Sequence, residues 1–256
     1  SHRVCHILRY TVSMGKPYKA NYRVRRLVAS ILLAIISVSG AVYFKSQEDL
    51  NSNTIKIENK LTDSNIQKNS AAKALNELEV KGRAPKTGYN RDQFGKGWQK
   101  DVSGCDTRNQ ILQRDLKEIK LDTHCKVISG VLDDPYTGKT INFTKGKNSD
   151  KVQIDHVVAL SNSWQTGAQL LPPEERIRLA NDPLNLLAVD GPANQQKGDA
   201  DAATWLPSNK SYRCAYIARQ IAVKKVYHLW VTQSEKTAME RILNSCPNQT
   251  LIIENQ

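Results

Sequence analysis

Two segments decide the fold that this sequence predicts: DHVVAL at residues 155–160 and NDPLNLLAVDGPANQQKGD at residues 181–199. The first segment continues a β-type run, VQI, and the second contains a short apolar run, LLAV, followed closely by a proline. Proline is favoured in the first turn of a helix, so a helix is expected to begin there. The predicted order is strand, loop, strand and helix, with polar residues gathered at the junctions. This order is typical of a metal site.

Four polar residues in these segments have the chemistry that phosphodiester hydrolysis needs. A neutral imidazole, here His156, can take a proton from water near pH 7. The carboxylate of Asp155 and the amide oxygen of Asn194 suit a hard divalent ion such as Mg²⁺, which would stabilise the phosphoryl charge and the leaving oxygen. Asn185 is expected to hold the loop that aims His156. We therefore interpret His156 and Asn185 as catalytic residues, and Asp155 and Asn194 as metal ligands.

Two basic residues are candidates for contacts with substrate phosphate. Lys197 follows Asn194 by three residues and would share its helix face. Arg108 follows a predicted turn and could clamp a phosphate with two hydrogen bonds. Each has an ordinary alternative: Lys197 as a solvated surface lysine, and Arg108 as a partner of a carboxylate that holds the fold.

The same residues carry a resemblance to a known family. The Asp155-His156 pair, Asn185 and Asn194 with this spacing resemble the HNH, or ββα-metal, nucleases. The wider sequence is most similar to the HNH-like domain of secreted bacterial proteins and of the C-terminus of GmrSD-type restriction endonucleases. The supporting motifs are GYNRDQFGKGW at residues 88–98, GCDTRNQIL at 104–112 and DPYTGKTI at 134–141. The resemblance covers roughly residues 80–246, and it implies a nuclease that uses Mg²⁺ or Mn²⁺.

Charge is unevenly distributed along the chain. The formal net charge is +12, and residues 1–45 contain eight Lys or Arg and no Asp or Glu. The remaining chain is therefore only mildly basic, and net charge alone is weak support for DNA binding. The basic segment 1–26 precedes an uncharged apolar run at 27–44, which is typical of a signal peptide or a signal-anchor helix. Residues 45–79 are interpreted as a flexible spacer, and residues 80–256 as the folded domain.

Four cysteines follow the apolar run, and an even number in an exported domain favours two disulfides. Helices are expected at residues 211–231 and 235–244. Cys214 lies on the same face of the first helix as Ile217 and Ile221, and Cys246 continues the apolar face of the second. Antiparallel packing of these helices would bring Cys214 to Cys246. This predicts a Cys214–Cys246 bridge and leaves Cys105 to pair with Cys125.

Together these features predict an α+β domain with an embedded ββα-metal motif, held by disulfides. The predicted function is metal-dependent cleavage of nucleic acid outside the cell, in DNA rather than RNA. The protein would be secreted after cleavage, or attached to the membrane by residues 27–44 if that segment is retained. The alternative is a secreted or anchored binding module without catalysis, in which the metal is structural. A peptidase is disfavoured because the sequence contains neither HExxH nor GxSxG.

Overall fold

The structure is a computed structural model that describes residues 26–33, 35, 43–48, 50–52, 54–56, 70–146 and 149–252. The chain divides into two units, Ser1–Leu61 and Thr62–Gln256. The described residues of the first unit are helical and exposed. Within the described ranges, no helix is both long and apolar enough to cross a bilayer. Part of the predicted apolar segment, residues 34 and 36–42, lies outside the described residues, as do residues 57–69 of the predicted spacer.

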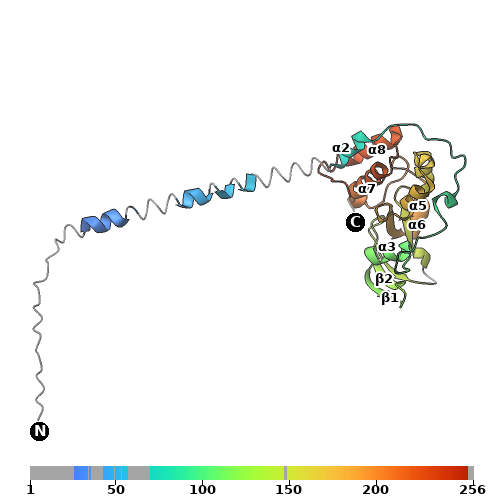
Figure 1. Ribbon diagram of the computed structural model, residues 1–256, viewed down its shortest axis with the longest axis horizontal. Helices are drawn as coiled ribbons and strands as arrows, with labels where there is room; N and C mark the ends of the chain where they lie inside the picture. Colours follow the sequence, from blue (N-terminus) through green and yellow to red (C-terminus); the bar gives the residue numbers. More distant parts are fainter. Residues whose placement is uncertain are drawn as a thin grey trace, which may run out of the picture. The chain divides into compact units, whose positions relative to one another are not determined.

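The second unit mixes helices and strands, as predicted (Figure 1). Its helices are α2 (Ala71–Glu77), α3 (Thr107–Asp115), α4 (Leu160–Gln165), α5 (Pro173–Asn181), α6 (Gly191–Lys197), α7 (Arg213–Val226) and α8 (Gln233–Leu243). Its strands are β1 (Lys117–Leu121), β2 (Val127–Asp133), β3 (Thr140–Thr144), β4 (Val152–His156) and β5 (Leu186–Asp190). The first three strands form one antiparallel sheet in the order β1-β2-β3, and β4 pairs antiparallel with β5.

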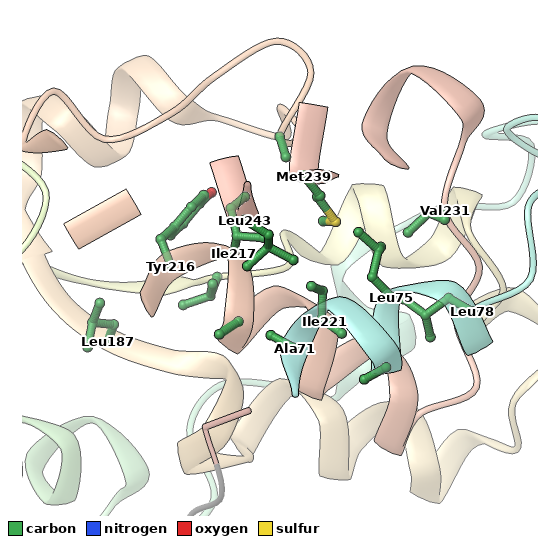
Figure 2. Close-up of a cluster of buried hydrophobic side chains, with 14 of the residues drawn as sticks. Ala71, Leu75, Leu78, Leu187, Tyr216, Ile217, Ile221, Val231, Met239 and Leu243 are labelled. Atoms are coloured by element: carbon green, nitrogen blue, oxygen red, sulfur yellow. The ribbon is translucent and has the colours of Figure 1, made fainter. Parts of the chain in front are cut away.

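Helix α2 belongs to the folded unit, although the sequence analysis placed it in the spacer. Ser70 caps the helix by accepting a hydrogen bond from the Lys73 backbone N–H. Residues 71, 74 and 75 have the spacing of one helix face and are buried against α7 and α8. Figure 2 shows Ala71 and Leu75 of α2 close to Ile221 of α7 and Met239 of α8. The expected domain boundary at residue 80 is therefore too late, because the first buried helix precedes it.

Both predicted disulfides are present. Cys105 and Cys125 are bridged with a Cα–Cα distance of 5.8 Å, and Cys214 and Cys246 with a distance of 6.4 Å. The pairing agrees with the predicted helix faces, because α7 and α8 pack together through the apolar face that follows Cys214 and the one that precedes Cys246. Helix α7 ends earlier than expected, at Val226, because His228 has a left-handed φ of 52° that turns the chain.

Strands β4 and β5 and helix α6 follow the order that the two opening segments predicted. Ile154 lies opposite Ala188, and α6 packs on both strands. The helix starts where Asp190 accepts a hydrogen bond from the Ala193 backbone N–H. Gly191 at the first helical position is required by close contact, since a Cβ there would lie 2.1 Å from the Asp150 carbonyl oxygen. This tight junction starts α6 beside the segment that leads into β4.

Candidate active site

A cavity of about 500 Å³ lies beside the end of β4. Four of the six predicted site residues line it: Asp155, His156, Asn194 and Arg108. Several other residues that line it had no role predicted from the sequence, namely Tyr89, Arg91, Gln153 and Asp199. Asn185 and Lys197 are buried and are not part of the lining. The structure therefore brings together residues from β4, α3, α6 and the 88–98 segment.

His156 is held as a neutral imidazole with one nitrogen available. Its Nε2 lies 2.9 Å from the Ala180 carbonyl oxygen, which can only accept, so we assign the proton to Nε2. Nδ1 then carries the free lone pair. Burial lowers the pKa of His156 to about 3, with smaller lowering by Arg91 and Lys197 and an opposing effect of the Ala180 hydrogen bond. The Trp98 ring stacks on the imidazole, with centroids 5.8 Å apart and planes inclined by 10°.

Asp155 is buried and bonded through both carboxylate oxygens. Oδ1 accepts from the Lys197 Nζ at 2.9 Å, and Oδ2 accepts from the Tyr136 hydroxyl at 2.5 Å. Burial raises the pKa of Asp155, although the Lys197 ammonium and the hydrogen bonds act in the opposite direction. Each carboxylate oxygen has accepted one bond and keeps a second lone pair. Asp155 can therefore still act as an oxygen ligand at the edge of the cavity.

Lys197 is placed differently from the prediction. Its side chain is 0 % exposed, and Nζ donates to the Asp155 carboxylate and to the His156 carbonyl oxygen, both at 2.9 Å. The buried face of α6 lies against β4, so this lysine points into the fold instead of toward a substrate. In this geometry Lys197 makes no contact with the cavity, and the ammonium holds the end of β4 in place.

Asn185 lies in the loop that supports His156. Its Oδ1 accepts from the Val158 backbone N–H at 2.8 Å, and its Nδ2 donates to the carbonyl oxygens of Val158 and Leu179. Its own carbonyl oxygen accepts from the Val157 N–H. These bonds fix the two residues that follow His156. The position suits the predicted support of the loop, and the effect on catalysis stays a prediction.

The donor set at the cavity fits a hard divalent ion. Asn194 donates through Nδ2 to Gln153 Oε1 at 2.9 Å, and its Oδ1 makes no hydrogen bond within the described residues. A carboxylate oxygen of Asp155 and this amide oxygen are of the type that Mg²⁺ prefers, with waters completing the coordination. The described part of the chain contains no group of three or more His, Cys, Asp or Glu residues that could hold a metal. A metal here would therefore depend on the amide and on water.

Two arginines border the cavity. Arg108 is half-buried and donates to the Val152 carbonyl oxygen at 3.3 Å, and desolvation lowers its pKa against a smaller effect of Asp106. It forms no ion pair within the described residues, so the carboxylate-partner alternative is not what the structure shows. Arg91 was not predicted as a site residue, because the only sign of such a role is its place in the motif at 88–98 that carries the family resemblance. Local spacing gives no sign that this exposed residue reaches the end of β4.

The chain is similar to known proteins in two comparisons. Residues 106–242 match the family described as GmrSD restriction endonucleases, C-terminal domain. A protein of Arthroderma benhamiae (strain ATCC MYA-4681 / CBS 112371), named as an uncharacterized secreted protein, is 40% identical over 188 residues, which cover 72% of this chain and 89% of the relative. No solved structure matches the chain. On the extent of these matches, the chain belongs to the family of the C-terminal domain of GmrSD restriction endonucleases.

Proposed function

We propose that this protein is a metal-dependent endonuclease that hydrolyses phosphodiester bonds in DNA outside the cytoplasm. The observation that carries the proposal is the state of His156, a residue that lines the cavity and whose Nε2 lies against the Ala180 carbonyl oxygen, which leaves Nδ1 as the proton acceptor. Membership of a family named for restriction endonucleases supports the same activity. We read β4, β5 and α6 as the ββα-metal motif of this enzyme.

Five residues of the site have a defined part in this reaction. Nδ1 of His156 takes the proton from the attacking water. Asp155 and Asn194 would hold Mg²⁺ or Mn²⁺, which supplies electrostatic stabilisation of the phosphoryl group and leaving oxygen. Arg108 binds a phosphate oxygen, and desolvation of its guanidinium strengthens that attraction. Asn185 keeps the imidazole aimed by fixing the loop behind it.

The proposed location outside the cytoplasm rests on three features. Both disulfides are formed, and disulfides persist in oxidising compartments. The relative from Arthroderma benhamiae is named as a secreted protein. The basic segment followed by an apolar run at residues 27–44 is typical of export signals.

An assay with nucleic acid substrates and defined metals tests the proposal. The full chain, with both disulfides oxidised, is incubated with supercoiled plasmid DNA or with RNA of similar length, in Mg²⁺, Mn²⁺ or EDTA. We expect nicking and then linearisation of the plasmid in either metal, slower cleavage of RNA, and no cleavage in EDTA. Binding of DNA without cleavage in any metal would instead support the binding-module alternative.

A further inference from the structure

A second, smaller cavity adjoins the proposed catalytic one. Its volume is about 190 Å³, and it shares with the larger cavity the residues Arg91, Trp98, His156 and Leu160. The two cavities therefore meet at the imidazole that we propose as the base. When the scissile phosphate of a substrate lies at His156, the group next to that phosphate can reach the smaller cavity.

The smaller cavity is lined by aromatic and apolar residues together with two polar ones, His156 and Arg91, of which Arg91 is the single cation. Phe94 and Trp98 form its aromatic part, and Leu160 is buried beside them. Gly97 also borders it, with a left-handed φ of 77°, and a Cβ at this position would meet no atom within 4 Å. The wall contains no acidic side chain. Such a lining suits a flat ring with an apolar face, which aromatic side chains recognise in single-stranded nucleic acids.

Arg91 is the cation that the two cavities share. It lies in the short 3₁₀ helix Arg91–Phe94, which Asn90 caps by accepting from the Asp92 backbone N–H. Its guanidinium is exposed and forms no hydrogen bond or ion pair within the described residues. It is nevertheless close enough to His156 to lower the pKa of that imidazole. An arginine in this setting is available for a phosphate oxygen.

We propose that the smaller cavity is a nucleotide subsite, in which the base of the nucleotide next to the scissile bond enters the cavity and Arg91 binds its phosphate. The volume is below the roughly 300–1,000 Å³ of pockets for drug-sized ligands, so the occupant is one ring system. A base can enter only after it leaves the helical stack. The substrate class is therefore single-stranded or locally unpaired nucleic acid. This inference rests on the proposed nuclease function, which it makes more specific.

Binding of a nucleotide is compared with binding of its separate parts to test the proposal. Binding of 2′-deoxythymidine 5′-monophosphate, 2-deoxyribose 5-phosphate and thymidine to the full chain is measured by NMR chemical-shift titration. None contains a phosphodiester bond, so binding is measured without turnover. We expect the nucleotide to bind about 5–150-fold more tightly than the sugar phosphate, which is the range for stacking of one base.

Arg91→Gln separates the phosphate contact from the base contact. We expect it to weaken binding of the nucleotide and of the sugar phosphate by about 10–150-fold, and to leave thymidine unchanged. The matched control is Arg241→Gln, which changes an exposed arginine of α8 that lines neither cavity and should alter no affinity. Equal affinities for nucleotide and sugar phosphate, or an unchanged nucleotide affinity in Arg91→Gln, would overturn the proposal.

The cleavage assay on the same preparation shows which of the two proposals fails. If DNA is cleaved but neither the base nor Arg91 contributes to nucleotide binding, the subsite proposal fails and the nuclease proposal stands. If nucleotide binding depends on the base and on Arg91 but no metal supports cleavage, the subsite proposal stands and the nuclease proposal fails. If both hold, an unpaired strand should be cut faster than the same sequence in a blunt duplex, and equal rates would contradict the subsite.

Discussion

Two regions of this molecule each contain a fully buried lysine paired with a carboxylate. At the end of β4, Lys197 contacts Asp155 at 2.9 Å, and between α7 and α8, Lys224 contacts Glu235 at 3.2 Å. Both ammonium groups are 0 % exposed, and each also donates to a backbone carbonyl oxygen at 2.9 Å. Both places thus contain a buried ion pair, although the Lys197–Asp155 pair is also a hydrogen bond, whereas Glu235 Oε1 has no hydrogen-bond partner among the described residues.

The surroundings of the two pairs differ. Glu235 belongs to the capping box at the start of α8, where its carboxylate accepts from the Thr232 backbone N–H, and it also pairs with Lys224 of α7. Asp155 instead borders a cavity that also contains His156 and Asn194. A buried ion pair by itself thus says little about function, because the same pair can simply connect chain segments. The cavity and the free imidazole nitrogen are what distinguish the β4 region.

The largest expected effect concerns the base. His156→Ala should lower the cleavage rate by about 10²–10⁴-fold, since the water loses its proton acceptor. His124→Ala is the matched control, because His124 is exposed and lines neither cavity. Steady-state cleavage of plasmid DNA in Mg²⁺ measures both variants. Full activity in His156→Ala would remove this histidine from the mechanism.

The two buried lysines provide the direct comparison. Lys197→Met and Lys224→Met should each lower the free energy of unfolding by about 3–5 kcal/mol, because a buried carboxylate loses its partner. Denaturant unfolding measures this loss. Only Lys197→Met should also reduce the cleavage rate of the protein that remains folded, since only Lys197 fixes Asp155 and the His156 carbonyl. Equal residual activities in the two variants would show that both pairs are purely structural.

The two disulfides distinguish stability from activity. Cys105–Cys125 spans a sequence separation of 20 and Cys214–Cys246 one of 32, so each should stabilise the fold by about 2–4 kcal/mol. The second contribution should be slightly larger because its loop is longer. Reduction should lower the melting temperature, measured by calorimetry, without lowering activity at temperatures where the protein is folded. If the reduced protein is folded but no longer cleaves DNA, the disulfides contribute to catalysis as well as to stability, contrary to this prediction.

The sequence predicted the Cys214–Cys246 disulfide because it follows from local helix periodicity, and Cys105–Cys125 then followed by elimination. It also predicted the segments that became β4, β5 and α6, since strand and helix signals lie within them. Strand β1 was missed because Lys117–Leu121 is charged and mostly exposed, without an alternating apolar pattern. The burial of Lys197 and the bond from Tyr136 to Asp155 were missed for another reason. Both depend on how distant segments pack, and neither leaves a local pattern.

Asn194 should act through the metal. Asn194→Ala should weaken the apparent affinity for Mg²⁺, by about 10–100-fold if it behaves like other changes around a metal site, and higher Mg²⁺ should partly restore the rate. Asn185→Ala should lower the rate without such restoration, because Asn185 fixes the loop instead of contacting the ion. Metal titrations of the cleavage rate measure both. The opposite pattern would exchange the two roles.

The last expected effect is a dependence of stability on acid. The pKa of His156 falls from 6.5 to about 3 on folding because the imidazole is desolvated. Between these values the unfolded chain binds one more proton at this residue than the folded chain does. Stability from this group is therefore complete above pH 6.5 and is lost as the pH falls toward 3, by about 1.4 kcal/mol for each unit within the window.

His156→Gln tests this dependence, because glutamine does not titrate. Asp155 also titrates in acid, and its raised pKa acts in the opposite direction, but that contribution is present in both proteins. The difference between the wild type and His156→Gln in free energy of unfolding, measured between pH 6.5 and pH 5, therefore isolates the histidine. The wild type should lose stability more steeply on acidification. Parallel curves would mean that the imidazole is protonated as easily in the folded protein as in the unfolded chain. His156 would then not be a buried neutral base, and the β4 region would lose the feature that distinguishes it from the region of the Lys224–Glu235 pair.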